Sequence, residues 1–99
     1  MDEGSVREHA NQHANAVMSG DMKTAGQDLT ESGMAAAPGV MKGMPRPVTS
    51  VEVTKLEQDG EALVAHIAYR GEGAERVVAS RWEDRDGRPM IVDLTVVSG

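Results

Sequence analysis

Residues 47–97, PVTSVEVTKLEQDGEALVAHIAYRGEGAERVVASRWEDRDGRPMIVDLTVV, decide the fold of this chain. Apolar and polar side chains alternate along much of this stretch, and turn signals interrupt it at residues 59–60, 71–73 and 86–87. Alternation with a period of two is typical of strands, and Asp-Gly at residues 86–87 is typical of a two-residue hairpin turn. The stretch therefore predicts four long strands in an antiparallel meander.

The half of the chain before these strands predicts helices over about residues 5–37. Ser5 and Glu8 have the spacing of a capping box at the start of a first helix, and Gly20 is placed to end it. Asp21 is placed to cap a second helix, which Gly33 closes. The Pro-Gly pair at residues 38–39 then stops the helical region, and a loop follows up to residue 47.

Composition limits the class of protein. With 99 residues, we expect one α+β domain over residues 1–99, in which the helices pack inside a curved four-stranded sheet. The net charge is −6, the Lys and Arg residues are scattered, and aromatic residues are nearly absent, so we expect no nucleic-acid partner. No run approaches the roughly 20 apolar residues that cross a bilayer, and the start of the chain lacks the pattern of a signal peptide. We therefore expect no membrane partner and a cytoplasmic location.

The predicted turns assign the side chains of the sheet to two faces. A three-residue turn at residues 71–73 places Ile67 opposite Val77, and a two-residue turn at residues 86–87 places Ala79 opposite Leu94. The face with Leu63, Ala65, Ile67 and Tyr69 then packs on the helices. The other face retains several apolar side chains, which is typical of an interface. We expect a homodimer through this outer face, with an interface formed by Val64, His66, Val78, Ser80, Trp82, Ile91 and Asp93.

The first strand, over about residues 48–56, is open to two interpretations. A two-residue turn before the second strand places Val51 and Val53 on the dimer face, whereas a bulge places them in the core.

The order of these elements resembles the NTF2-like superfamily, a group of cone-shaped α+β domains. The matching residues are His13, Ala16, Gly20, Asp21, Ala25 and Leu29. The resemblance implies a sheet that wraps the helices around a pocket, and dimers formed across the outer sheet face. The group includes isomerases, cyclases, hydrolases and non-enzymatic members. Isomerase-like members use a Tyr from the first helix, and this chain has none there, so that site does not carry over.

Several residues are candidates for contact with a ligand in such a pocket. Arg81 falls on the predicted core face, where it must either pair with a carboxylate such as Glu83 or meet an anionic ligand. Tyr69 supplies the only phenol. The chain has seven Met and no Phe, so the Met side chains either replace Phe in the core or line an adaptable apolar pocket. The predicted ligand-binding residues are Arg81, Tyr69, Leu63, Met22 and Met41.

Catalytic and metal-binding signals are weak. Asp28 is the one candidate base, because a helix can direct its carboxylate into the cone, although such a residue also pairs or caps. His9 and His13 have the i,i+4 spacing of metal ligands, but no third ligand accompanies them, so we expect neither a metal site nor a cofactor. Three other residues, His66, Ser80 and Asp93, share the predicted outer face, but their predicted pairing does not place His between the other two, as a catalytic triad requires.

The sequence therefore favours a homodimeric module that binds a small apolar or weakly anionic molecule. Two alternatives stay open. One is an isomerase-like or cyclase-like enzyme acting on a small apolar substrate, and the other is a purely structural dimerisation module with a filled core.

Overall fold

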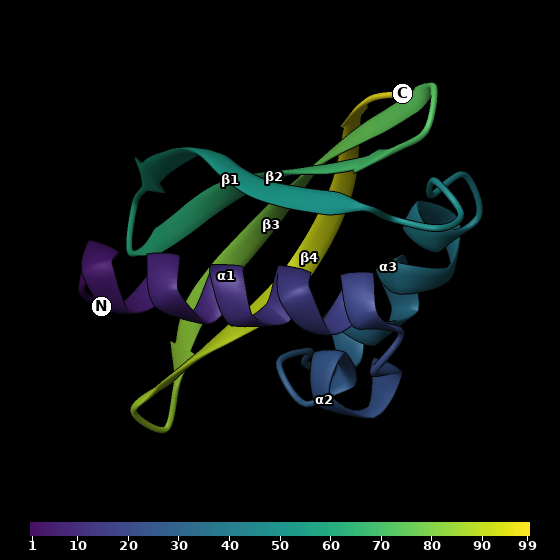
Figure 1. Cartoon of the computed structure of the whole chain (residues 1–99). Coiled ribbons are helices and arrows are strands. Elements are labelled where there is room, and N and C mark those ends of the chain that lie inside the picture. The colour runs from purple at the N-terminus through teal and green to yellow at the C-terminus, as the bar shows by residue number, and fades with distance from the viewer.

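The computed structural model describes residues 1–99 and contains three helices followed by a four-stranded sheet. The strands lie in the order β1-β2-β3-β4, and each is antiparallel to its neighbours. The helices pack against one face of this sheet (Figure 1), which confirms the α+β fold with an antiparallel meander. The elements are α1 (Glu3–Ser19), α2 (Met22–Gly26), α3 (Glu31–Met41), β1 (Ser50–Asp59), β2 (Ala62–Gly71), β3 (Ala74–Arg85) and β4 (Arg88–Ser98).

The first helix begins earlier than the capping box predicted. Asp2 is the N-cap of α1, and its carboxylate accepts a hydrogen bond from the Ser5 backbone N–H at 3.3 Å. An Asp side chain caps a helix as well as a Ser does, so the turn between Asp2 and Ser5 becomes helical. The predicted end is correct, because Gly20 adopts the left-handed conformation with φ 79°.

The second predicted helix is in fact two helices. Asp21 caps α2 as expected, but α2 ends at Gly26, and Thr30 caps a separate α3 that continues through Pro38 to Met41. Gly33 lies inside α3 instead of ending a helix. A Cβ atom at Gly33 would lie 2.4 Å from the Ile91 carbonyl oxygen, so the absence of a side chain lets α3 approach β4.

Two of the differences from the predicted strand pairing exchange the faces of a strand. The β2–β3 turn contains two residues, 72–73, so that Ile67 pairs with Val78 instead of Val77. In β4, the register shifts at Val92, because Trp82 pairs with Ile91 whereas Arg81 pairs with Asp93. A β-bulge of this kind leaves one residue without a partner, which sequence alternation alone does not reveal.

These shifts correct the predicted dimer interface. Val78, Ser80, Trp82 and Ile91 are at most 2% exposed and belong to the interior between sheet and helices. The interior also satisfies the polar atoms of this group, because the Trp82 indole N–H donates to Ser80 Oγ at 2.9 Å and Ser80 donates to the Ala65 carbonyl at 2.8 Å. Only Val64, His66 and Asp93 of the predicted interface lie on the outer face.

The outer position of His66 and Asp93 also separates them from Ser80. His66 lies 3.6 Å from Glu57, and Asp93 is opposite Arg81 on the neighbouring strand. The three side chains of the rejected catalytic triad therefore do not share a face of the sheet.

The open question about β1 is settled by a bulge. The register shifts between Val53 and Lys55, and Val51 and Val53 pack against the core cluster. The hydrogen-bonded pair Asp59 and Ala62 closes the β1–β2 turn one residue later than predicted.

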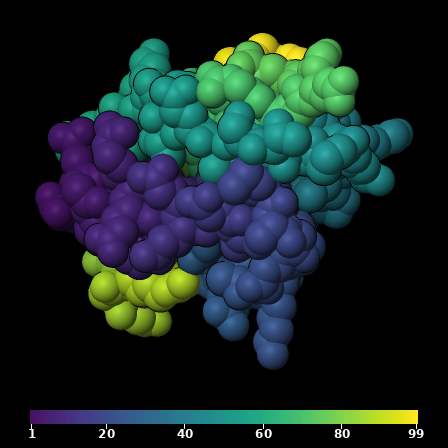
Figure 2. Space-filling view, viewed as in Figure 1, coloured from purple at the N-terminus to yellow at the C-terminus, as the bar shows by residue number.

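Helix α1 lies across the sheet with α2 beside it, and the hairpins β2–β3 and β3–β4 extend beyond α1 on opposite sides (Figure 2). None of the three helices combines the length and the apolar character needed to cross a bilayer.

The interior is a cluster of 12 buried residues, to which α1 contributes Val6, Ala10 and Ala14.

Candidate functional site

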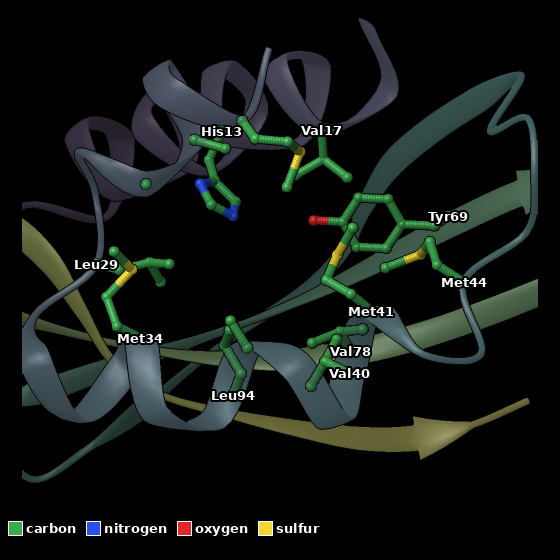
Figure 3. A pocket seen from close by; sticks show the side chains of 14 residues that line it. His13, Val17, Leu29, Met34, Val40, Met41, Met44, Tyr69, Val78 and Leu94 are labelled. Carbon is green, nitrogen blue, oxygen red and sulfur yellow. The ribbon is translucent and has the colours of Figure 1, made fainter. Parts of the chain in front are cut away.

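A cavity of about 230 Å³ lies between α1, the α2–α3 region and the inner face of the sheet (Figure 3). Twelve of its 14 lining residues are hydrophobic, so the space favours an apolar occupant. Two of the lining residues carry polar side-chain groups: His13, from α1, and Tyr69, from β2, whose side chains extend toward the cavity from different sides. The lining residues are His13, Val17, Met22, Ala25, Gly26, Leu29, Met34, Ala37, Val40, Met41, Met44, Tyr69, Val78 and Leu94.

Met side chains both fill the core and line the cavity, the two roles that the sequence left open. Met44 is 7% exposed and belongs to the core cluster, yet it also lines the cavity. Met22 and Met34 are 47% and 53% exposed, so these two flexible side chains form part of the cavity rim. Because Met adapts its shape at low cost, this rim can open without rearrangement of the backbone.

His13 belongs to a polar cluster that is centred on Asp28. Its Nδ1 atom lies 3.1 Å from Asp28 Oδ2, and the side chains of His13 and Asp28 are only 6% and 10% exposed. The second carboxylate oxygen of Asp28 accepts a hydrogen bond of 2.7 Å from Arg88 Nη2. Three residues distant in sequence, from α1, the α2–α3 connection and β4, are thus joined in one network.

The backbone holds this network in place. The Ile91 N–H donates to the Asp28 carbonyl at 2.7 Å, so the α2–α3 connection pairs with the edge of β4. Arg88 also donates to the Gln27 carbonyl at 2.8 Å. Asp28 therefore cannot shift without breaking contacts to β4.

This geometry revises the candidate role of Asp28. The carboxylate is buried and paired, and it does not line the cavity. It reaches the cavity only through His13, whose other ring nitrogen, Nε2, has no hydrogen-bond partner in the protein. Asp28 is thus placed to orient the imidazole ring and not to contact a bound molecule.

Tyr69 is the second polar group at the cavity. Its side chain is buried, and its hydroxyl group has no hydrogen-bond partner in the protein. Burial raises the pKa of this phenol well above its usual value, so the hydroxyl stays neutral and can donate a hydrogen bond. Figure 3 shows the hydroxyl oxygen directed into the cavity.

Arg81 and Leu63 do not lie at the cavity. Arg81 is on the outer face, where it pairs with Asp59 at 2.5 Å and with Glu83 at 3.3 Å. These hydrogen bonds raise the pKa of the Arg81 guanidinium, and the one to Asp59 has the larger effect. The ion-pair interpretation of Arg81 is therefore correct, and the one-residue shift of β3 explains why the residue is not in the core. Leu63 is buried beside Trp82 at the other end of the sheet. Of the predicted ligand contacts, Tyr69, Met22 and Met41 line the cavity.

His9 and His13 do not share a site. His9 Nδ1 lies 2.8 Å from the Ser5 carbonyl oxygen, whereas His13 faces Asp28. Both rings lie edge-on to Trp82, with centroid distances of 6.4 and 6.3 Å. The chain contains no group of three or more His, Asp or Glu residues arranged to hold a metal ion.

Sequence reasoning missed two members of the polar network. His13 was considered as a metal ligand beside His9 and as a residue that matches the NTF2-like superfamily, but not as the partner of a buried carboxylate. Arg88 follows a hairpin turn and gives no local signal, because its partner is 60 residues away.

Comparison with known proteins adds no assignment. No family model matches the chain, and neither the curated proteins nor the solved structures contain a significant match. The resemblance to the NTF2-like superfamily stays a prediction.

Proposed function

We propose that this protein binds a small, largely apolar molecule that carries one hydrogen-bonding group. The observation that carries the proposal is the pair of unpartnered polar atoms, His13 Nε2 and the Tyr69 hydroxyl, at a cavity whose other walls are almost entirely apolar. Two polar groups without protein partners that face one apolar cavity favour a ligand that pairs with them.

The chemistry of the walls narrows the ligand class. Neither Lys nor Arg lines the cavity, and Arg81 is neutralised on the outer face, so the proposal is for a neutral molecule. With the His13 proton on Nδ1, Nε2 accepts a hydrogen bond and Tyr69 donates one, which suits a hydroxyl group on an apolar ring. The resemblance to the NTF2-like superfamily, whose members enclose a pocket of this kind, points the same way.

The proposal includes no homodimer interface. The dimer was predicted from an apolar outer face, but three of its residues lie in the core: Val78, Trp82 and Ile91. The remaining outer face carries ion pairs around Arg70 and Arg81, which contribute little to association when they are exposed.

The experiment is a titration with 2-naphthol, a two-ring phenol, with naphthalene as the matched control without the hydroxyl group. We expect 2-naphthol to quench or shift the fluorescence of Trp82, which contacts His13 edge-on. We expect naphthalene to bind about tenfold more weakly, because it leaves both polar atoms unpartnered. Equal affinity for the two probes would mean that His13 Nε2 and the Tyr69 hydroxyl do not contribute to binding. No binding of either probe, together with no retained mass in native mass spectrometry, would favour the purely structural module.

A further inference from the structure

We propose that the solvent-facing side of α3 pairs with the same side of α3 in a second copy of this chain, antiparallel and about a twofold axis. The pairing goes beyond the proposed function, because it depends on no ligand. It also differs from the dimer predicted from the sequence, which used the outer face of the sheet. It rests on the exposed residues of α3, on the lack of charge among them and on the two charges at the ends of the helix.

The solvent-facing side of α3 is mostly apolar. The helix packs mainly against β4, and Gly33 and Val40 are its buried residues. The exposed residues between the two ends of the helix are Ser32, Met34, Ala35, Pro38 and Gly39. Only Ser32 among them has a polar side chain, and its hydroxyl donates a hydrogen bond of 2.7 Å to the Val92 carbonyl. No other side chain on this surface can form a hydrogen bond with water.

The exposed surface of α1 has the opposite character. From Arg7 to Ser19, every exposed residue of α1 is charged or polar, as is usual on the solvent side of a helix. In α3, by contrast, residues 32–41 contain no charged residue, although 26% of the chain is charged. Met34 is 53% exposed. An apolar surface that no other part of the chain covers is typical of an interface.

One charged residue marks each end of this surface. Glu31 is the first residue of α3, and Lys42 is its C-cap. Both are exposed, and neither has a salt-bridge partner within the chain. About three helical turns separate the two, so they lie on the same side of the helix but too far apart to pair with each other. Each sign suits the dipole of α3, but that effect requires no uncharged surface between them.

A twofold axis makes the two ends complementary. In an antiparallel pair, the start of one helix lies beside the end of the other, so Glu31 faces Lys42 of the partner subunit, and symmetry repeats this contact at the other end. Ala35 and Pro38 lie between the charged ends, near the axis, where the apolar surface packs against its own image. No like charges meet in this arrangement, although each chain carries a net charge of −6. Charge complementarity therefore favours a second copy as the occupant of this surface.

The pairing is expected to be weak and reversible. An 11-residue helix offers less area than a standard protein–protein interface. We expect a dissociation constant on the order of 100 µM.

The first experiment is sedimentation velocity of the whole chain between about 10 µM and about 1 mM, a range that spans the expected dissociation constant. We expect monomer at the low end and mostly dimer at the high end. Ala35→Arg places a charge at the centre of the pair and should weaken association at least about tenfold. Ala74→Arg is the matched control, because it adds the same charge at an exposed position at the start of β3, and it should associate like the unmodified protein.

The second experiment exchanges the charges at the ends of α3. Glu31→Lys and Lys42→Glu each place like charges opposite each other at both ends of the pair, so each variant alone should associate at least about tenfold more weakly. In an equimolar mixture of the two variants, opposite charges meet again at both ends. The mixture should therefore associate about as strongly as the unmodified protein, and circular dichroism checks that each variant is folded.

Each outcome supports or overturns the pairing. A chain that stays monomeric at about 1 mM overturns it. A dimer that Ala35→Arg does not weaken, or variants that fail to associate when mixed, also overturn it. If a charge variant does not fold, the comparison of Ala35→Arg with Ala74→Arg decides alone. A monomer that binds phosphatidylcholine vesicles, and loses this binding in Ala35→Arg, overturns the pairing in favour of a lipid surface.

Discussion

The space between the helices and the inner face of the sheet is filled at one end of the sheet and hollow at the other. At one end, which we call the filled end, Leu63, Trp82 and Ile91 pair across three strands, and the indole ring fills the space beneath α1. At the other, the hollow end, the sheet supplies Tyr69, Val78 and Leu94 to a cavity of about 230 Å³. The chain has one Trp and no Phe, so it has no second large side chain to fill both ends.

The two ends differ in whether their polar groups have partners inside the protein. Polar groups at the filled end are satisfied internally, since Trp82 donates to Ser80 and Ser80 to the Ala65 carbonyl. Polar groups at the hollow end, His13 Nε2 and the Tyr69 hydroxyl, are left without protein partners. Substitutions at the filled end should therefore change stability, and substitutions at the hollow end should mainly change binding.

Trp82→Ala should have the largest effect on stability. Removal of a fully buried Trp should lower the free energy of unfolding by about 3–5 kcal/mol, a large part of the about 5–15 kcal/mol typical of a domain. Urea denaturation followed by circular dichroism measures this loss. Val97→Ala, at a position 53% exposed, is the control and should change stability by less than about 0.5 kcal/mol. If Trp82→Ala lowered the free energy of unfolding as little as Val97→Ala does, the filled end would not be the main source of stability.

Asp28→Ala should have the next largest effect. It leaves His13 Nδ1 without its buried partner and Arg88 without its carboxylate, so we expect a loss of about 1–3 kcal/mol in urea denaturation. Asp59→Ala is the matched control, because the Asp59 side chain is exposed where it pairs with Arg81 and its loss should matter less. Equal losses for the two variants would show that the buried network adds no stability beyond that of a surface pair.

Tyr69→Phe should change how stability depends on pH. Because burial raises the pKa of Tyr69 in the folded state, its contribution is complete below the pKa of the unfolded phenol and is lost as pH rises above that value. Relative to the unmodified protein, Tyr69→Phe should therefore gain about 1 kcal/mol between neutral pH and about pH 11. Denaturation of both proteins at the two pH values gives the difference. Parallel pH profiles would indicate that the phenol ionises freely in the folded protein.

Ala37→Leu should have the smallest effect on stability and a clear effect on binding. Ala37 lines the cavity, so a larger side chain should fill part of it and raise the free energy of unfolding by about 0.5–1 kcal/mol. The same change should weaken 2-naphthol binding at least about tenfold in a fluorescence titration. Ala35→Leu, at an exposed position of α3 outside the cavity, should leave binding unchanged. If both variants bind 2-naphthol equally, the probe does not occupy the hollow end.

Local sequence signals predicted the elements but not the faces. The Asp-Gly turn at residues 86–87 and the Gly20 cap are correct because each depends on a residue that tolerates positive φ. The turn at residues 72–73 and the bulge at Val92 were missed, and each displaced the register by one residue. A displacement of one residue was enough to assign Trp82 to the surface and Arg81 to the core.

The candidate site was only partly predictable. Tyr69 and the Met residues were found because their chemistry is rare in this composition, and Asp28 because it follows a short helix. The partnership of His13, Asp28 and Arg88 was not found, because these residues meet only when α1, the α2–α3 connection and β4 pack together.

The sequence by itself determined an α+β chain of N-terminal helices and an antiparallel four-stranded meander. Helix caps, turns and the alternation of apolar and polar residues depend only on residues that are close together in the sequence. Only the tertiary structure decided which face of the sheet is buried, where the cavity lies and which charged side chains meet at Asp28. Those outcomes depend on register and on contacts between residues 60 or more positions apart, for which the local sequence carries no signal.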